Sequence, residues 1–243
     1  MILIPMIRML TTFLILLLFL PIFVSMMIVG IVSSYLMHPR YFYWSMHLGC
    51  KLLLLGGWQY HTIHGQVPPK SKGPYLFMFN HESMFDAFML GASIPYYINA
   101  IGWEGIFKWP LWGFFAKRYG AYQITHDNTE QAKATLKVAE KILLVDKDSM
   151  IFSPEGNRTI TGEMSEFKKG GFHFAKATNA TIVPIGIVGA FKANVRTSWI
   201  IKPGRLKTVF GTPITPDDYS DLSIENFRDL VRNKIVNLVK DFS

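Results

Sequence analysis

The sequence predicts an α/β protein whose central sheet is mostly buried and flanked by helices, after a first part made of two apolar helices. One observation is a change of pattern at Gly73, where short apolar runs begin to alternate with stretches of helical periodicity, as in α/β domains. A second is an N-terminal run without charge. The third is composition: 50% of the 243 residues are hydrophobic and 17% are charged. Soluble domains carry about 25% charged residues, so some apolar surface is expected to face lipid.

The first expected element is a helix over Met9–Met37, a run that contains no charged residue. As a helix it would be roughly 43 Å long, against about 30 Å for the hydrocarbon core of a bilayer. This length permits a tilted span, or a helix that bends at Pro21 or Gly30 and dips into one leaflet. A cleaved signal peptide is the alternative. It is disfavoured because the run is long and no small-x-small site stands at its end.

A second helix is expected directly afterwards. The aromatic cluster Tyr41–Trp44 lies beside basic residues and precedes Lys51 and the run Leu52–Leu55, which is typical of an anchor at the level of lipid headgroups. The alternative is an ordinary buried helix of the next domain. Residues 1–60 are therefore predicted to form a membrane anchor, and residues 61–243 an α/β domain.

The net charge of +8 favours either an anionic membrane surface or nucleic acid as a partner. The basic residues are scattered rather than gathered in a stripe, and the mean hydropathy is positive (+0.22). A lipid bilayer is therefore the expected partner, and nucleic acid is not. The single cysteine, Cys50, excludes an intrachain disulfide.

Within the α/β domain the apolar runs predict strands, several of them continuously apolar as in strands covered on both faces. These runs are residues 75–79, 121–124, 150–152, 182–188 and 206–210. A helix is expected after Asp127–Glu130, which resembles a capping box. Another helix closes the chain, with an apolar face formed by Ile224, Phe227, Val231, Ile235, Leu238 and Phe242.

The first candidate for chemistry is the segment Asn80–Asp86, directly after the predicted strand 75–79. Active-site residues favour the carboxyl ends of strands in such sheets, and histidine is the usual general base at neutral pH. A carboxylate on its second ring nitrogen fixes the tautomer and stabilises the imidazolium. Residues five apart diverge by about 140° on a straight helix. His81 must therefore precede the helix, with Asp86 in its first turn pointing back.

The spacing of Ser83 and Asp86 also matches a capping box with Ser83 at the N-cap. In the purely structural alternative, Asp86 only caps the helix and His81 is a loop histidine. A zinc site of the metalloprotease kind is disfavoured, because Phe85 stands where the second histidine would be needed. No metal site is predicted.

The second candidate is Phe152–Arg158, again at the end of a predicted strand and followed by Phe167–Gly171. The planar fork of arginine suits phosphate or carboxylate, and adjacent glycines let backbone amides approach an anion. Taken alone, the segment is better explained as a turn with a solvated charge pair between Glu155 and Arg158.

Together the two segments resemble the signatures of the glycerophospholipid acyltransferases, and those of lysophosphatidic acid acyltransferases most closely. Asn80–Asp86 matches the first signature, Asn-His-x-x-x-x-Asp, also called the HX4D motif. Ser153–Arg158 resembles the third signature, Phe-Pro-Glu-Gly-Thr-Arg, and Phe167–Gly170 resembles its tail. Ile182–Ile185 resembles the fourth, an apolar strand with an internal proline. Order and spacing agree over residues 73–215.

The second family signature is matched only in part. Pro110–Gly113 and Gly120–Tyr122 are recognisable, but His126 stands where an arginine is expected, and Trp103 near the place of a lysine. In the family those basic residues are thought to hold the acceptor's phosphate. The resemblance therefore implies a phosphate-binding site with fewer basic residues here. The residues expected to supplement it are Arg158, Lys168 and Lys169, with either Arg118 or a protonated His126.

The resemblance implies an O-acyltransferase that moves a fatty acyl group from an acyl thioester to the free hydroxyl of lysophosphatidic acid, giving phosphatidic acid in phospholipid biosynthesis. The donor would be acyl carrier protein or coenzyme A in thioester form, and no cofactor is expected. Catalysis is assigned to His81 and Asp86. Substrate binding is assigned to Glu155, Gly156, Arg158, Lys168 and Lys169.

The expected location is the bacterial inner membrane, with the catalytic domain on the cytoplasmic face. Two alternatives stay open. One is the same chemistry on another lysolipid, such as a lyso-ornithine lipid, which the altered second signature makes plausible. The other is a non-catalytic membrane-binding protein of the same fold, which is disfavoured because a binding module needs no base beside a carboxylate.

Overall fold

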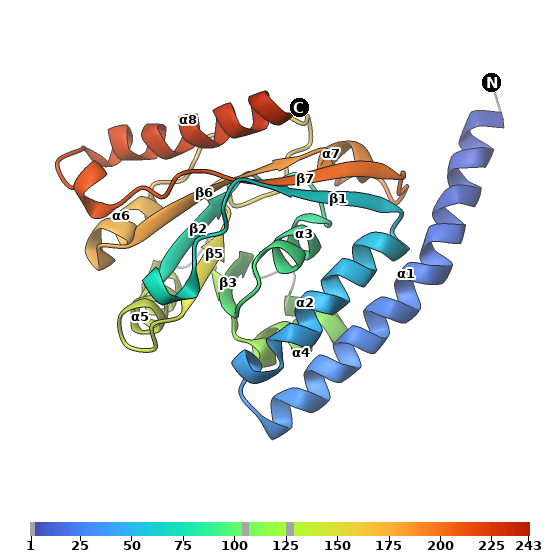
Figure 1. Cartoon of the computed structure of the whole chain (residues 1–243), viewed down its shortest axis with the longest axis horizontal. Helices are drawn as coiled ribbons and strands as arrows, with labels where there is room; N and C mark the ends of the chain where they lie inside the picture. The colour runs from blue at the N-terminus through green and yellow to red at the C-terminus, as the bar shows by residue number, and fades with distance from the viewer. Residues whose placement is uncertain (1–2, 104–106, 125–128) are drawn as a thin grey trace.

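A computed structural model describes residues 3–103, 107–124 and 129–243. In these ranges seven strands form one sheet, in the order β1-β7-β6-β2-β5-β3-β4 (Figure 1). The strands are β1 (Gln59–His64), β2 (Tyr75–Phe79), β3 (Ile98–Trp103), β4 (Ala121–Ile124), β5 (Ser149–Phe152), β6 (Thr181–Val188) and β7 (Gly204–Phe210). The helices are α1 (Leu3–Leu36), α2 (Pro39–Gly56), α3 (Asp86–Ser93), α4 (Pro110–Tyr119), α5 (Thr129–Leu144), α6 (Gly170–Thr178), α7 (Ala190–Ala193) and α8 (Ile224–Phe242).

The sheet is parallel except between β6 and β7, which are antiparallel. β2 lies in the middle, with β5 on one side and β6 on the other. Because these three strands are parallel, their carboxyl ends meet at one edge of the sheet. The segments that follow β2, β5 and β6 are therefore neighbours in space although they lie far apart in the sequence.

The two faces of the sheet are covered by different helices. Tyr75, Phe77 and Phe79 of β2 belong to a core that α1, α2, α3 and α4 complete. Leu76 and Met78 belong to a second core, formed with α5, α6 and α8. Successive side chains of a strand point to opposite faces, so both sets must be apolar. This explains the continuously apolar runs in the sequence.

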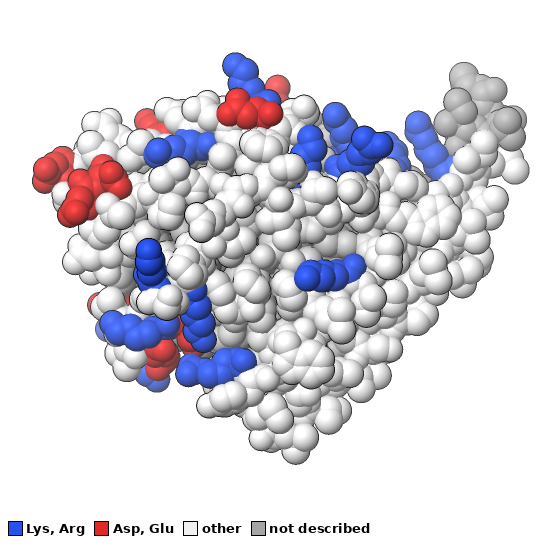
Figure 2. Space-filling view, viewed as in Figure 1, with Lys and Arg blue, Asp and Glu red and all other residues white. Residues whose placement is uncertain are grey.

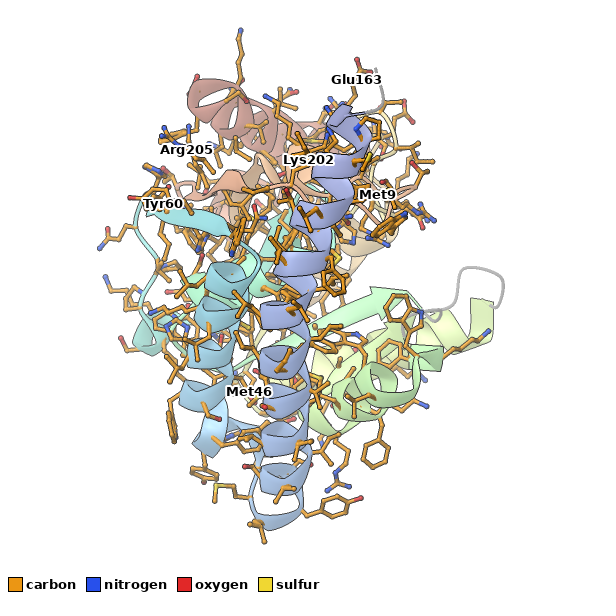
Figure 3. All side chains as sticks on the ribbon, turned by 90° about the vertical axis from the view of Figure 1, so that its right-hand side faces the viewer. Met9, Met46, Tyr60, Glu163, Lys202 and Arg205 are labelled. Atoms are coloured by element: carbon orange, nitrogen blue, oxygen red, sulfur yellow. The ribbon has the colours of Figure 1, made fainter. Side chains whose placement is uncertain are left out.

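α1 and α2 run side by side in opposite directions along one flank of the sheet domain (Figures 1 and 3). The inner face of α1 is aromatic. Phe19 meets Phe88 of α3 edge-on, with ring centroids 5.6 Å apart, and Phe23 stacks on Trp112 of α4 at 5.8 Å. Edge-to-face and offset-stacked pairs at such distances are favourable beyond their buried area. The N-terminal helices are thus packed onto the domain along one face only.

None of the described residues packs against the outer face of α1. The helix is continuous through Pro21 and Gly30, and its segment Pro5–Leu36 is long and apolar enough to cross a membrane, with 28% of its most apolar window buried. On the face drawn in Figure 2, charged side chains gather over the sheet domain, while the flank along α1 is almost bare of them. Exposed apolar side chains on this helix include Met6, Leu10, Phe13, Leu17, Leu18 and Val32.

α2 divides in the same way. Tyr43 and Met46 are buried, whereas Tyr41 and Trp44 are 68% and 70% exposed. Arg40 ties the start of the helix to the sheet domain through a salt bridge of 3.0 Å to Asp148. The predicted aromatic cluster is therefore half core and half exposed surface. The buried-helix explanation holds for one face, and the anchor stays a prediction for the other.

The predicted fold class is confirmed, and the five predicted strands appear as β2, β4, β5, β6 and β7. The terminal helix is confirmed as α8. β1 and β3 are not predicted. β1 is a half-exposed edge strand with four polar residues (Gln59, His61, Thr62 and His64), and β3 is interrupted by Asn99 and Gly102. Part of the capping-box pattern, at 127 and 128, lies outside the described residues, and α5 is described from Thr129.

Candidate active site

The site begins where β2 ends. The Asn80 side chain, at the first position after the strand, donates to the carbonyl of Ile187 at 2.9 Å and accepts from its N–H at 2.7 Å. Asn80 is 4% exposed, and its side-chain amide extends the hydrogen bonding between β2 and β6 by one residue. The next residue, His81, is thereby fixed at the carboxyl edge of the sheet.

His81 and Asp86 meet as the spacing predicts. Asp86 is the first residue of α3, and its Oδ2 lies 2.6 Å from Nδ1 of His81. The Asp86 side chain is 1% exposed, and that of His81 is 29% exposed. Nε2 has no hydrogen-bond partner in the part of the chain that the structure describes. The imidazole is therefore held on its inner nitrogen and open on its outer one.

Two backbone amides also donate hydrogen bonds to the Asp86 carboxylate. The N–H groups of Glu82 and Ser83 donate to Asp86 at 2.7 Å and 3.1 Å. The chain between His81 and α3 curls around this carboxylate, which explains how residues five apart can face each other. A buried carboxylate with several donors keeps one orientation.

One detail of the prediction is wrong. Ser83 is not the N-cap of α3, because that position belongs to Phe85, in helical backbone conformation and without a side-chain cap. The Ser83 hydroxyl donates instead to the carbonyl of Asn194 at 3.0 Å. Half of the capping-box pattern does exist, since Asp86 accepts from the Ser83 N–H. Ser83 thus ties the histidine segment to the loop that follows α7.

The second predicted segment, which follows β5, forms hydrogen bonds with the backbone of His81. Glu155 is 4% exposed and accepts the His81 N–H at 2.7 Å. Its other oxygen accepts from the N–H and hydroxyl of Ser165, at 2.8 Å and 2.7 Å. The N–H of Thr159 donates to the carbonyl of His81 at 2.9 Å. Glu155 therefore positions His81, and the direct acceptor contact assigned to it stays a prediction.

Gly156 needs its lack of a side chain. Its φ of +77° lies in the left-handed region, and a Cβ there would stand 2.9 Å from Nζ of Lys168. The Lys168 N–H donates to the carbonyl of Pro154 at 2.9 Å. Lys168 therefore lies against the turn that leads to Arg158, and the substrate contacts assigned to Gly156 and Lys168 stay predictions.

The predicted basic residues do not all gather. Lys169 forms a 2.6 Å salt bridge with Glu225 of α8, at the surface. Arg118 donates to the hydroxyl and carbonyl of Ser34 at the end of α1 and lies 3.8 Å over the Tyr35 ring. The expectation that Arg118 supplements the phosphate-binding site is therefore wrong. His126 lies outside the described residues.

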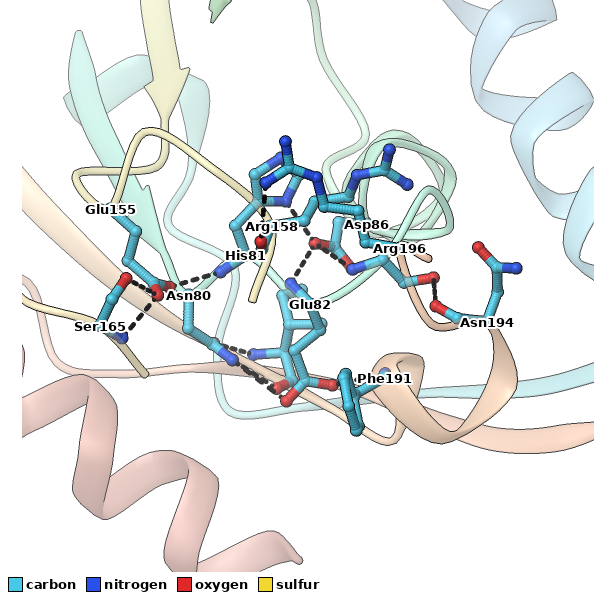
Figure 4. Close-up of polar contacts among 12 residues, drawn as sticks. Asn80, His81, Glu82, Asp86, Glu155, Arg158, Ser165, Phe191, Asn194 and Arg196 are labelled. Carbon is cyan, nitrogen blue, oxygen red and sulfur yellow. Dashed lines mark hydrogen bonds and ion pairs between the residues drawn. The ribbon is translucent and has the colours of Figure 1, made fainter. Parts of the chain in front are cut away.

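A residue that sequence reasoning missed stands beside Arg158. Arg196, in the loop after α7, donates from Nη1 to the carbonyl of Arg158 at 3.4 Å (Figure 4). Burial lowers the pKa of the Arg158 guanidinium, the nearby Arg196 lowers it further, and Asp86 raises it. The signal that could have found Arg196 is topological, because its loop follows β6, the neighbour of β2.

Glu82 is a second residue missed from the sequence. It is 8% exposed and accepts the N–H of Phe191 at 2.9 Å. Burial raises the pKa of its carboxyl group to about 7; the amide of Phe191 opposes this shift, and Asp86 adds to it. A cavity of about 40 Å³ lies between Glu82, His81 and Glu155. It has room for about one water molecule, so substrate chains must lie outside it.

The arrangement can perform base catalysis but offers no evident nucleophile. Cys50 is buried in α2, and the Ser83 hydroxyl is bound to a backbone carbonyl. A histidine held by a buried carboxylate can take a proton from an alcohol at its open nitrogen. The adjacent cations suit an anionic group on that alcohol.

Comparison with known proteins agrees with this chemistry. A family model described as Acyltransferase matches residues 61–188. The chain is 28% identical over 170 residues to a 1-acyl-sn-glycerol-3-phosphate acyltransferase of Cocos nucifera, which covers 70% of this chain and 54% of that protein. A Saccharomyces cerevisiae protein of the same name is 27% identical over 173 residues, with 70% and 57% covered. The chain spans little more than half the length of these two relatives.

A solved structure matches over nearly the whole chain. The crystal structure of the 1-acyl-sn-glycerophosphate (LPA) acyltransferase PlsC from Thermotoga maritima has a TM-score of 0.82 at 20% identity, covering 97% of each chain. At this level of identity the likeness establishes the fold, including the paired helices before the sheet.

Proposed function

The chain belongs to the acyltransferase family, and on that premise we propose that it transfers a fatty acyl group from an acyl thioester to the free hydroxyl of lysophosphatidic acid, producing phosphatidic acid. The proposal is supported by the activity named for its relatives. The observation that carries it is the 2.6 Å contact between His81 and Asp86 with the outer ring nitrogen left open.

In the proposed reaction, Nε2 of His81 takes the proton of the acceptor hydroxyl as its oxygen attacks the thioester carbonyl carbon. The carbon–sulfur bond then breaks, and the departing thiolate regains a proton from the imidazolium. Asp86 holds Nδ1–H throughout and stabilises the positive charge on the ring. The transfer is direct, with no acyl-enzyme, and the donor is a thioester of coenzyme A or acyl carrier protein.

The acceptor's phosphate is assigned to the cationic side of the site. Arg158 is partly buried next to Asp86, and Lys168 lies across Gly156, whose amide is held in a turn. Arginine matches phosphate oxygens with two parallel hydrogen bonds, and lysine acts as a point charge. Lys169 is assigned to the surface contact with Glu225 rather than to the substrate.

The proposed location is the bacterial inner membrane, with the sheet domain on the cytoplasmic side. α1 presents an apolar outer face, and Trp44 and Tyr41 of α2 are exposed beside it. Aromatic side chains of this kind settle at the boundary between headgroups and acyl chains. In this position the acyl chains of acceptor and product stay in lipid while the hydroxyl reaches His81.

An acceptor panel tests the proposal. Purified protein in lipid is assayed for thiol release from acyl-coenzyme A and acyl carrier protein thioesters, with lysophosphatidic acid, lysophosphatidylcholine or a lyso-ornithine lipid as acceptor. Turnover is expected with lysophosphatidic acid. Turnover with other acceptors only would favour the same chemistry on another lysolipid. Silence with every acceptor and both donors would contradict the enzyme and favour a membrane-binding protein.

A further inference from the structure

Three adjacent strands deliver their loops to one edge of the sheet. β5 leads to Arg158, β2 to His81, and β6 through the short helix α7 to Arg196. Because β5, β2 and β6 are parallel neighbours, the histidine stands between the two arginine-bearing loops. Arg196 lies outside every segment that resembles a family signature.

The loop of Arg196 is braced from within. Asn194 is 5% exposed, and its side-chain amide donates to the carbonyls of Ser198 and Ile200, at 3.0 Å and 3.2 Å. The carbonyl of Asn194 accepts the Ser83 hydroxyl from the histidine segment at 3.0 Å. The loop is therefore folded around one buried amide and tied to the catalytic turn.

The far end of the loop is fixed to the N-terminal helix. The buried Thr12 hydroxyl of α1 accepts the N–H of Ile201 at 3.1 Å and lies 3.2 Å from its carbonyl. Hydrogen bonds hold both ends of the loop, so the backbone position of Arg196 is fixed, although its side chain is exposed.

The two guanidinium groups lie near enough to interact: in addition to burial, Arg196 lowers the pKa of Arg158, and the nearby Asp86 raises it. Arg196 donates to the carbonyl of Arg158 (Figure 4), and Arg158 lies within electrostatic reach of Asp86. Among the described residues, neither forms a salt bridge with a carboxylate. Two like charges held together repel each other, and a bound dianion relieves that repulsion.

We propose that Arg158 and Arg196 together bind the phosphate of the acceptor and make the site selective for a phosphomonoester. This inference rests on the proposed function. Phosphomonoesters of this kind carry about −1.5 to −2 charges at pH 7, which matches two guanidinium groups. A phosphodiester such as lysophosphatidylcholine carries one negative charge and is matched less well. Arg196 thereby replaces charge that the incomplete second signature lacks.

The test compares Arg196→Ala with Lys192→Ala, a matched control that removes an exposed cation of α7 in the same connection. The full-length protein is assayed in lipid with varied lysophosphatidic acid at fixed acyl-coenzyme A, and then the reverse. Arg196→Ala is expected to raise the KM for lysophosphatidic acid tenfold or more, with kcat and the donor KM within about twofold of wild type. Lys192→Ala should change neither KM, and Arg196→Lys should recover part of the loss.

A second readout does not depend on turnover. Hexadecyl phosphate, which has the phosphate but no hydroxyl to acylate, should compete with the acceptor, and Arg196→Ala should raise its inhibition constant by a similar factor. An unchanged acceptor KM and inhibition constant in Arg196→Ala, with the wild type active on lysophosphatidic acid, would overturn the inference alone. Failure of the wild type to use lysophosphatidic acid would overturn the proposed function and this inference with it.

Discussion

The two sides of the active site differ in how their polar groups are satisfied. On the histidine side, Asp86 is buried and accepts from His81 and from two backbone amides, while Glu155 fixes the backbone of His81. On the cationic side, Arg158 and Arg196 have no carboxylate in a salt bridge within the described chain. The protein itself supplies the hydrogen-bond partners of the catalytic base, whereas the two arginines are left to bind an anionic ligand. Changes on the first side should therefore lower kcat, and changes on the second should raise KM.

The largest effect is expected from Asp86→Asn. The amide keeps the shape of the side chain but removes the charge that stabilises the imidazolium, and it disturbs the tautomer of His81. General-base catalysis contributes on the order of 10²–10⁴ in rate, so kcat should fall at least 100-fold with the acceptor KM nearly unchanged. Steady-state kinetics in lipid would measure this. A rise in KM at normal kcat would mean that the division between the two sides is wrong.

Arg158→Ala should produce the opposite pattern. Losing one charged partner of a phosphate costs roughly 1.5–3 kcal/mol, which corresponds to about a 10- to 160-fold rise in the KM for lysophosphatidic acid. The kcat should stay within a few-fold of wild type. Varying the acceptor at saturating donor separates the two constants. An unchanged KM would remove Arg158 from the phosphate site.

Glu82 provides the smallest expected effect, on stability rather than turnover. Burial raises the pKa of its carboxyl group to about 7, from an ordinary value of 4.5. The folded protein therefore holds this proton more tightly than the unfolded chain does, and the stability it contributes is lost as pH rises through about 7. Between pH 5 and pH 7 the wild type should lose on the order of 1–2 kcal/mol relative to Glu82→Gln.

Thermal unfolding of the two proteins at both pH values, in the same detergent, would measure that difference. The melting temperature of Glu82→Gln minus that of the wild type should become more positive by a few degrees at pH 7. A difference independent of pH would show that Glu82 is ionised throughout this range.

Much of the fold follows from local sequence pattern. The runs 75–79 and 182–188 contain no charged or amide side chain and are almost wholly apolar because both faces of the sheet are covered, so they can be recognised in the sequence alone. The pairing of His81 with Asp86 also follows from local geometry, since only a turn before a helix can bring them together. β1 is missed because an edge strand with one exposed face needs no apolar run.

The remaining features of the site depend on which strands are neighbours. The grip of Glu155 on the His81 backbone requires β5 beside β2, and the approach of Arg196 to Arg158 requires β6 on the other side. The salt bridge that holds Lys169 on α8 depends on packing in the same way. The spacing of residues in the sequence does not show which strands and helices are neighbours. A basic residue close to a signature in sequence therefore need not contact the substrate.

The most direct test of the account is the kcat of His81→Ala in protein shown to be folded by its thermal unfolding. The side chain is partly exposed, and its removal breaks one hydrogen bond on Asp86 while both backbone amide donors remain. A fall of at least about 100-fold in acyl transfer to lysophosphatidic acid is expected. Near-normal transfer by the folded variant would contradict the account, because another group would then have to take the hydroxyl proton.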